Sequence, residues 1–182
     1  MNKVILYIAT SQDGFIADEQ GGVNWLPSEP DVEDSVGYQK FLHRISTIVM
    51  GRKSYDQILT FGSWAWSDKQ TYVFTSRPFA IEQPYIQAVS ASPKVFIEAQ
   101  KKNFSNNDIW LLGGASLASS FAQEKLIDEV IITIVPQILQ KGIRLKLPWE
   151  DFFLDEEKEC GEGMVQKKYL LNPVCQKTIL PE

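Results

Sequence analysis

Apolar segments of strand length alternate with amphipathic segments of helix length along most of this chain. The first apolar segment, residues 3–10, is rich in apolar and β-branched residues, which is typical of a strand buried on both faces of a sheet. Comparable segments predict further strands at residues 46–50, 71–75, 86–89, 109–112 and 128–135, and the short apolar segment 15–17 follows the first strand.

The segments between these strands show helical spacing. Residues 32–44 carry apolar side chains, including Val36, at intervals that predict an amphipathic helix. Ser92 before Pro93 is typical of an N-cap residue followed by proline at the first helical position, so we expect a helix that runs towards residue 102. Two more helices are predicted at residues 53–59 and 116–123.

The order of these elements predicts a single α/β domain over residues 1–182. Alternating strands and helices favour a mostly parallel sheet with helices on both faces. The C-terminal part, including residues 164–171, is predicted to form strands joined by turns, which would add an antiparallel edge. The sequence shows no repeat, low-complexity stretch or linker, and this supports one domain.

Composition narrows the class of protein. Of the 182 residues, 44% are hydrophobic and 12% aromatic, which is enough for a full core without disulfides or metals. The net charge of −5 argues against nucleic acid as a partner, because phosphate backbones bind basic surfaces. No apolar segment has the length of a membrane span or of a signal-peptide core. We therefore expect a soluble cytoplasmic protein.

Metal and disulfide chemistry are not expected. Cys160 and Cys175 form no Cys-x-x-Cys pair and are predicted to be free thiols in a reducing cytosol, with a single disulfide between them as the alternative. His43 is the single histidine and has no cysteine near it in the sequence, so no zinc site is predicted.

A buried strand that ends at glycine and leads into a helix occurs twice, at residues 48–54 (Ile-Val-Met-Gly-Arg-Lys-Ser) and 109–116 (Ile-Trp-Leu-Leu-Gly-Gly-Ala-Ser). Ligands of open α/β sheets bind at the carboxyl ends of strands, where a helix N-terminus offers free N–H groups to a phosphate and glycine permits close approach. Ser116 is expected to cap the second helix. One such junction alone is more often a tight turn, but two of them predict a clamp for a dinucleotide pyrophosphate.

Three polar residues, Thr75, Ser76 and Arg77, end the strand that follows the first junction. Two hydroxyls and a guanidinium suit a ribose 2′-phosphate, because arginine pairs well with a dianion. This interpretation favours NADPH over NADH. The alternative is a plain turn before Pro78.

Four motifs together resemble the dihydrofolate reductase superfamily: residues 11–17 (Ser-Gln-Asp-Gly-Phe-Ile-Ala), 49–55 (Val-Met-Gly-Arg-Lys-Ser-Tyr), 75–78 (Thr-Ser-Arg-Pro) and 112–115 (Leu-Gly-Gly-Ala). Within it, the chain is similar to the reductase domain of the bacterial riboflavin-biosynthesis deaminase/reductase. The resemblance implies a sheet of about eight strands. It also implies hydride transfer from bound NADPH to a C=N or C=O bond of a heterocycle or sugar.

The resemblance further implies where the cofactor lies. Small and apolar residues, Ala9, Ile16 and Ala17, match positions that border the nicotinamide. The residues implied at the phosphates and along the rest of the cofactor are Gly51, Arg52, Lys53, Ser54, Thr75, Ser76, Arg77, Leu112, Gly113, Gly114, Ala115, Ser116 and Leu117.

Reduction by this chemistry needs a proton as well as a hydride, and the sequence offers several acids. Residues 25–29 (Trp-Leu-Pro-Ser-Glu) resemble the Trp-x-Leu-Pro-x-Asp signature of dihydrofolate reductases but are one residue shorter, which makes Glu29 one candidate acid. When the position is instead counted back from the predicted helix, the candidate is Asp34. Glu33 is a third choice. The resemblance implies that Thr133 supports the carboxylate.

The substrate is less closely defined. The riboflavin-pathway branch usually has lysine where this chain has Phe15 and glutamate where it has Leu112, which argues against its phosphoribosyl substrate. Trp25 and Tyr38, with other loop aromatics, suit an apolar slot for a flat ring. We expect a small heterocyclic substrate without a phosphate tail. The riboflavin intermediate, a dihydrofolate-type substrate and a non-catalytic NADPH-binding module stay open as alternatives.

One apolar segment and the resemblance to the family predict the oligomeric state. Residues 130–135 are apolar enough to pair at a sheet edge, and members of the family often dimerise, so a homodimer is expected.

Overall fold

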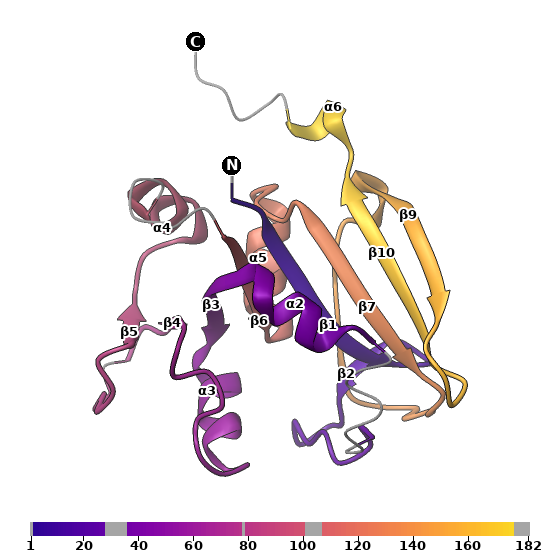
Figure 1. The fold of residues 1–182 in the computed structure, drawn as a ribbon, viewed down its shortest axis with the longest axis horizontal. Coiled ribbons are helices and arrows are strands. Elements are labelled where there is room, and N and C mark those ends of the chain that lie inside the picture. Colours follow the sequence, from indigo (N-terminus) through magenta and orange to yellow (C-terminus); the bar gives the residue numbers. More distant parts are fainter. Residues whose placement is uncertain (1, 28–35, 78, 101–106, 177–182) are drawn as a thin grey trace.

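A computed structural model describes residues 2–27, 36–77, 79–100 and 107–176 of the chain (Figure 1). In chain order its elements are β1 (Val4–Ser11), β2 (Phe15–Ala17), α2 (Tyr38–Arg44), β3 (Ile45–Gly51), α3 (Arg52–Leu59), β4 (Gln70–Phe74), β5 (Ile86–Val89), α4 (Pro93–Gln100), β6 (Asp108–Gly113), α5 (Ala115–Gln123), β7 (Glu129–Val135), β8 (Ile143–Arg144), the 3-10 helix η1 (Trp149–Asp151), β9 (Phe152–Glu159), β10 (Val165–Leu171) and α6 (Pro173–Gln176).

Eight strands form one sheet in the order β5-β4-β3-β6-β1-β7-β10-β9. Neighbouring strands from β5 to β7 are parallel, whereas β10 is antiparallel to both β7 and β9. The predicted α/β fold, with a mostly parallel sheet and an antiparallel C-terminal edge, is therefore confirmed. The remaining two strands, β2 and β8, pair with each other beside this sheet.

Helices cover both faces of the sheet (Figure 1). On one face, Phe41 of α2 and Tyr55 of α3 pack around Ile5 of β1. On the other face, α4 and α5 pack around Leu6, with Phe121 fully buried. Consecutive residues of β1 enter different cores because side chains of a strand point alternately to opposite faces. Burial on both faces explains why the central strands are almost continuously apolar.

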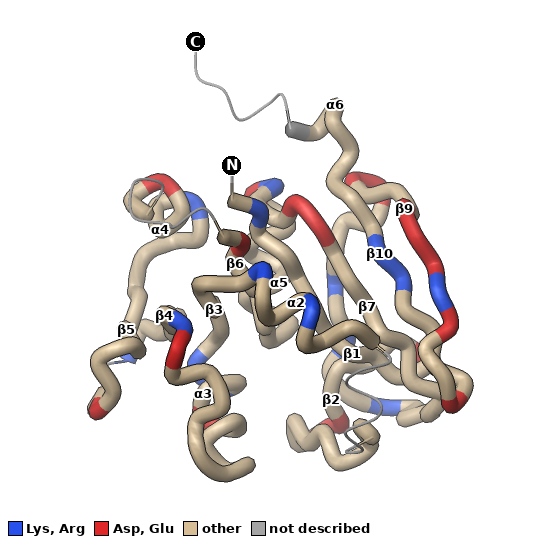
Figure 2. Tube along the Cα trace, viewed as in Figure 1, with Lys and Arg blue, Asp and Glu red and all other residues tan. Residues whose placement is uncertain are grey.

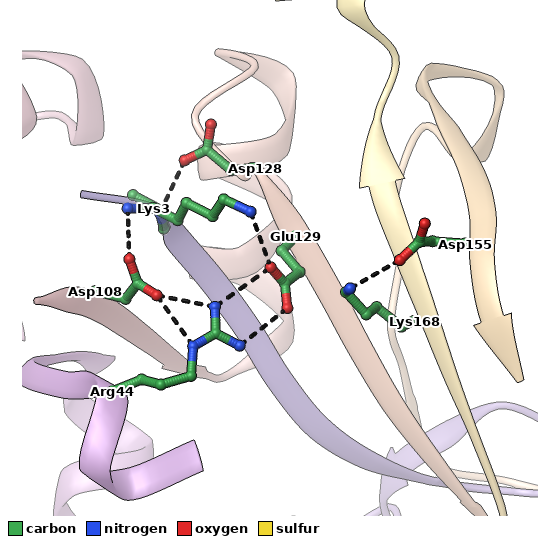
Figure 3. Close-up of polar contacts among 8 residues, drawn as sticks. Lys3, Arg44, Asp108, Asp128, Glu129, Asp155 and Lys168 are labelled. Carbon is green, nitrogen blue, oxygen red and sulfur yellow. Dashed lines mark hydrogen bonds and ion pairs between the residues drawn. The ribbon is translucent and has the colours of Figure 1, made fainter. Parts of the chain in front are cut away.

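Four charged residues meet at the amino ends of the parallel strands, and Figure 3 shows their contacts. Arg44, at the end of α2, donates to Asp108 of β6 at 2.9 Å and to Glu129 of β7 at 3.4 Å. Lys3 also reaches Glu129, at 3.5 Å. The Glu129 side chain is only 1% exposed, so its polar atoms have these partners in place of water. We call Lys3, Arg44, Asp108 and Glu129 the ionic cluster.

The C-terminal hairpin carries its own charge pairs. Acidic residues of β9 face basic residues of β10 along the edge of the sheet (Figure 2). Lys167 pairs with Glu157 at 2.9 Å and Lys168 with Asp155 at 2.7 Å. Across the residues that the structure describes, no helix has the length and apolar character needed to cross a membrane.

Three predictions from the sequence are wrong in detail. Helix α2 begins at Tyr38, after Val36, because Gly37 adopts φ 71° at its N-cap and breaks the helical path. Ser116 does not cap α5, because that helix starts one residue before it, with Gly114 as the N-cap residue. The segment at residues 130–135 belongs to β7, which lies between β1 and β10, so it is not a free edge for dimerisation.

Candidate functional site

The two glycine junctions lie side by side at the carboxyl ends of β3 and β6. These strands pair in parallel, with Met50 opposite Gly113. A β-carbon added to Gly51 would lie 3.8 Å from the amide nitrogen of Gly114 and 3.9 Å from the carbonyl oxygen of Gly113. The juxtaposition that the repeated motif suggested is therefore present.

At the second junction, backbone geometry favours glycine at one position and a close contact leaves little space at the next. Gly113 has φ 127°, which side chains rarely allow. A β-carbon on Gly114 would meet the Ser54 hydroxyl at 3.3 Å, so α3 and the second junction are in close contact. The peptide bond between the two glycines is cis.

The helix N-termini that start here are α3 and α5. Their N-cap residues, Gly51 and Gly114, make no side-chain cap hydrogen bond. The first N–H groups of each helix therefore have no side-chain cap, and the positive ends of both helix dipoles lie at this edge of the sheet. Such an arrangement suits the phosphates of a nucleotide.

The charged residues after Gly51 differ in how firmly they are held. The guanidinium of Arg52 donates to Asp56 at 2.7 Å and lies 4.2 Å from the centre of the Phe79 ring. Lys53 is exposed, and Ser54 is partly buried against Gly114. This region therefore presents a fixed guanidinium and an exposed amine close to the junction.

The segment Thr75–Arg77 follows β4, the strand beside β3. The Thr75 hydroxyl donates to the carbonyl of Arg77 at 3.0 Å and accepts from its N–H at 3.1 Å, which closes a tight turn. Ser76 and Arg77 are exposed. Because Phe74 is in register with Gly51, this turn lies at the same edge of the sheet as the glycine junctions.

The loop between β1 and β2 is tied to the segment after β7. Asp13 accepts hydrogen bonds from the amides of Leu139 at 3.2 Å and Gln140 at 2.8 Å. Arg144 donates to the Asp13 carbonyl at 2.7 Å. Burial raises the pKa of Asp13, but hydrogen bonds from Ser11 and from these two amides outweigh it and hold that pKa below its usual value. The contacts fix the position of β2, which carries Ile16 and Ala17.

Two hollows open near these elements. The larger, about 680 Å³, lies beside α5 and is lined by Phe15, Ala115, Ser116, Ser119, Ser120, Gln123, Gly142, Ile143, Arg144 and Lys146. The smaller, about 160 Å³, is lined by Tyr7, Ala9, Leu26, Pro27, Val36, Tyr38, Thr133, Val135 and Met164. The structure thus places the predicted substrate residues Phe15 and Tyr38 in different hollows.

The larger hollow contains one stacked pair. The guanidinium of Arg144 lies 4.1 Å from the centre of the Phe15 ring, and Phe15 itself is 5% exposed. Most of this aromatic ring is therefore covered by neighbouring groups rather than open to a ligand.

Of the other aromatic residues in the loops, some pack in the core and others lie at the surface. Trp64 and Trp66 pack in the core with Tyr55 and Tyr38, and Trp66 donates its indole N–H to the Tyr38 hydroxyl at 3.0 Å. Trp25 packs against the smaller hollow's wall near Val135, whereas Phe61 is exposed. Only Tyr38 of the predicted aromatic slot lines the smaller hollow among the described residues.

The smaller hollow has a polar network that the sequence did not reveal. Gln166 of β10 donates to the Thr133 hydroxyl at 3.1 Å and to the Val36 carbonyl at 3.0 Å. The Tyr7 hydroxyl donates to the same carbonyl at 3.2 Å. The apolar pattern of β1 predicts a buried strand but does not indicate that the Tyr7 hydroxyl forms a hydrogen bond there. The same holds for the Gln166 amide in β10. A tyrosine or glutamine on the buried face of a strand is the signal that was available.

Several predicted residues can be placed only in part. Glu29, Glu33 and Asp34 lie outside the described residues, so their roles stay predictions. Leu112 packs towards the core below α2 and α3, and Leu117 towards the core below α5. Among the residues that the structure describes, no cluster of three potential metal ligands occurs.

Comparison with known sequences identifies relatives along most of the chain. Residues 2–145 match the family model of the RibD C-terminal domain. The protein YwjB of Bacillus subtilis (strain 168) is 36% identical over 144 residues, which cover 79% of this chain and 82% of YwjB. YyaP of the same organism is 30% identical over 190 residues, covering 96% of this chain and 92% of YyaP. Both relatives are named as uncharacterized proteins.

Solved structures agree with this relationship. A Shewanella sp. PV-4 protein named for riboflavin biosynthesis is 27% identical, with a TM-score of 0.81 over 93% of this chain and 99% of that one. Dihydrofolate reductase from Enterococcus faecalis shares the fold at 15% identity, with a TM-score of 0.68 over 93% and 96% of the two chains. A Thermotoga maritima deaminase/reductase also matches, with a TM-score of 0.68 at 15% identity; the match covers 94% of this chain and 57% of that longer chain. The chain therefore has a dihydrofolate-reductase-like fold and belongs to the RibD C-terminal domain family.

Proposed function

We propose that this chain is an NADPH-dependent reductase that delivers a hydride to a C=N or C=O bond of a small heterocyclic compound. The observation that carries the proposal is the contact between the two glycine junctions, where Gly51 faces Gly113 and Gly114. Two helix N-termini without side-chain caps start at this point, and they match the two phosphates of a dinucleotide.

The residues around the junctions fit this cofactor. NADPH supplies the hydride when bound, and the chain's part is to hold and orient it. Gly51 and Gly114 permit close approach of the phosphates. Arg52, held by Asp56 and Phe79, and the exposed Lys53 supply positive charge beside them. The further residues proposed at the phosphates are Ser54, Gly113, Ala115, Ser116 and Leu117.

The turn at Thr75–Arg77 supports NADPH rather than NADH. Ser76 and Arg77 are exposed at the same edge of the sheet as the junctions, one strand further out. A hydroxyl and a guanidinium in this position suit the 2′-phosphate that distinguishes the two cofactors.

The opposite end of the cofactor is proposed to lie near Ala9, Ile16 and Ala17. Ala9 also lines the smaller hollow, so a ring bound there would lie next to the nicotinamide. Glu29, Asp34 and Thr133 are the proposed residues for proton delivery and its support. Thr133 is opposite Ala9 in the pairing of β1 with β7, which puts it within this hollow.

The size and lining of the smaller hollow support a compact substrate. Its volume of about 160 Å³ is below the roughly 300 Å³ at which pockets for drug-sized ligands begin. The Thermotoga maritima relative is named as a 5-amino-6-(5-phosphoribosylamino)uracil reductase. Here Phe15 and Leu112 replace the polar residues usual in that branch, which supports a ring without a phosphoribosyl tail.

A nucleotide titration tests this function. Tryptophan fluorescence of the full chain, which has five tryptophans, is followed during addition of NADPH and, separately, NADH. Tight binding of NADPH with weak binding of NADH is expected, and absence of binding by either rejects the proposal. Oxidation of NADPH in the presence of small cyclic imines and lactams then separates a reductase from a module that only binds the cofactor.

A further inference from the structure

The larger hollow lies between α5 and the segment that follows β8. Residues 143–151 run from β8 to η1, and Asp151 of η1 lies 4.0 Å from the amine of Lys125, just after the end of α5. Between these points, Leu145 and Leu147 pack against the core below α5. The segment therefore extends along α5, with the larger hollow between the two.

The larger and the smaller hollow lie on opposite faces of the sheet. Phe121 of α5 packs in the same core as Leu6 of β1, whereas Tyr7, the next residue of β1, lines the smaller hollow. Consecutive side chains of a strand point to opposite faces. The sheet therefore separates a ligand in the larger hollow from any ring in the smaller one.

Two cations line the larger hollow without an acidic partner. Arg144 and Lys146 both belong to its lining, and neither forms an ion pair with any residue that the structure describes. No aspartate or glutamate belongs to the described lining. In a chain of net charge −5, two positive charges therefore face one hollow, and a bound anion would neutralise them.

Arg144 is held in one orientation. Its Nη1 donates to the Asp13 carbonyl at 2.7 Å, and its guanidinium lies 4.1 Å from the centre of the Phe15 ring. The pairing of β8 with β2 fixes the backbone at the same point, with Arg144 in register with Phe15. A guanidinium that is already oriented loses less conformational entropy when its remaining N–H groups bind an oxyanion.

The opposite side of the larger hollow carries hydroxyl groups. Ser116, Ser119 and Ser120 share one face of α5, because residues three and four positions apart are neighbours on a helix. Ser120 donates to the Ser116 carbonyl at 3.1 Å, whereas the Ser119 hydroxyl is available as a donor to an anion oxygen. The volume of about 680 Å³ lies within the range of pockets for small organic ligands. Cations and hydroxyls around such a space favour an organic anion over an apolar ring.

We propose that the larger hollow is a second ligand site, which binds a small organic dianion through Arg144, Lys146 and the Ser119 hydroxyl. The dianion is either a phosphate ester or a dicarboxylate, since both present paired oxygens to a guanidinium. This site goes beyond the proposed reductase function. It adjoins the cofactor clamp at Ala115 and Ser116, but its cations belong to the segment that follows α5 on the far side of the hollow.

Two simple probes test the site on the full chain without any nucleotide. Inorganic phosphate and succinate are titrated at constant ionic strength, at a pH where both carry two charges, and amide NMR spectra locate the binding. We expect saturable shifts at residues 116–120 and 143–146, with a dissociation constant of about 1 mM or lower for the better probe. Tighter binding of phosphate assigns a phosphate ester, and tighter binding of succinate assigns a dicarboxylate. Absence of saturable shifts at these residues with both probes overturns the proposal.

Variants then assign the binding to residues. Lys146→Met removes one charge from an exposed position and is expected to weaken binding about tenfold, the loss of one charge-assisted hydrogen bond. Ser119→Asp places a negative charge in the larger hollow and is expected to weaken binding by at least the same factor. Arg144 also contacts Asp13 and Phe15, so these two variants test the site without disturbing those contacts. Wild-type affinity in both variants, with folding intact, overturns the assignment.

Lys141→Met is the matched control for charge. Lys141 is exposed and lies just before β8, but it does not belong to the lining of the larger hollow. The control is expected to keep the wild-type affinity, and a loss equal to that of Lys146→Met would show a general charge effect and overturn the proposal.

Gly51→Ala separates the larger hollow from the cofactor clamp. A methyl group on Gly51 would lie between the two glycine junctions, whereas Gly51 does not line the larger hollow. The affinity for the probe is therefore expected to stay unchanged. A tenfold loss in Gly51→Ala with none in Lys146→Met would place the dianion at the clamp and overturn the proposal. Since no nucleotide is present, a failed NADPH titration and a failed dianion titration are separate results.

Discussion

A β-carbon on Gly51 would lie 3.8 Å from the amide nitrogen of Gly114, so one methyl group would occupy the space between the two junctions. Gly51 itself has φ −79°, a conformation open to every residue. We therefore predict that Gly51→Ala folds normally but loses affinity for NADPH by about tenfold or more, because the methyl group blocks close approach of a phosphate.

Thermal melting and nucleotide titration check this prediction together. NADPH and NADH share the pyrophosphate, so their affinities should fall by the same factor and their ratio should stay unchanged. Wild-type affinity in a folded Gly51→Ala protein would place the cofactor elsewhere.

Substitutions in the turn after β4 should change the ratio of the NADPH and NADH affinities, which Gly51→Ala should leave unchanged. Changing Ser76→Ala and Arg77→Ala together removes one hydroxyl and one guanidinium from an exposed position. Charge-assisted hydrogen bonds contribute roughly 1.5–3 kcal/mol each, so NADPH affinity should fall at least tenfold while NADH affinity changes little. Lys94→Ala, on the exposed surface of α4, is the control for a general loss of positive charge. Equal weakening of both nucleotides would reject a 2′-phosphate role.

The ionic cluster predicts a stability effect far from the ligand. After Arg44→Met, Lys3 at 3.5 Å is the one residue that still forms an ion pair with the buried carboxylate of Glu129 among the described residues. Breaking a fully buried pair costs about 3–5 kcal/mol, and because Arg44 is 40% exposed we expect about 2 kcal/mol here. Chemical denaturation measures this loss. Lys167→Met, which breaks the more exposed pair with Glu157, should change the free energy of unfolding by less than about 1 kcal/mol.

Asp13 predicts a pH dependence. Its folded-state pKa lies below the usual value of 3.8, so its carboxylate form stabilises the fold. That contribution is fully present above pH 3.8 and is lost as the pH falls through the lower folded-state pKa. The difference in unfolding free energy between wild type and Asp13→Ala should therefore be constant above this range and shrink below it. Gln87→Ala, which replaces an exposed side chain of β5 that does not titrate, should show no such change. A difference that grows on acidification would contradict the role of Asp13.

The fold was largely predictable because its signals are local and repeated. The apolar strands and their glycine ends stand out in the sequence, and the parallel direction of the strands, seen for β3 and β6, follows from their alternation with helices. The error at the start of α2 arose because Val36 fits the amphipathic spacing, whereas Gly37, in the left-handed conformation, is the N-cap residue from which α2 starts. Periodicity records the apolar positions but not the conformation of a single glycine.

The candidate site was predictable only where a motif carries it. Gly51 and Gly114 were found because glycine before a helix is visible in one stretch of sequence. Tyr7, Thr133 and Gln166 come from three strands, and their contact depends on strand order and register. A single sequence does not encode that order in any local pattern, so Tyr7 and Gln166 were missed.

Figure 3 shows the ionic cluster where β1, β6 and β7 begin, whereas the glycine junctions lie at the carboxyl ends of β3 and β6. The ionic cluster connects β1, β6 and β7 at their amino ends. The smaller hollow opens at the carboxyl ends of β1 and β7. The residues that hold the strands together are thus different from the residues that would contact a ligand. Side chains around the smaller hollow can diverge between relatives, and with them the compound that is accepted, while the anchor of the sheet stays intact.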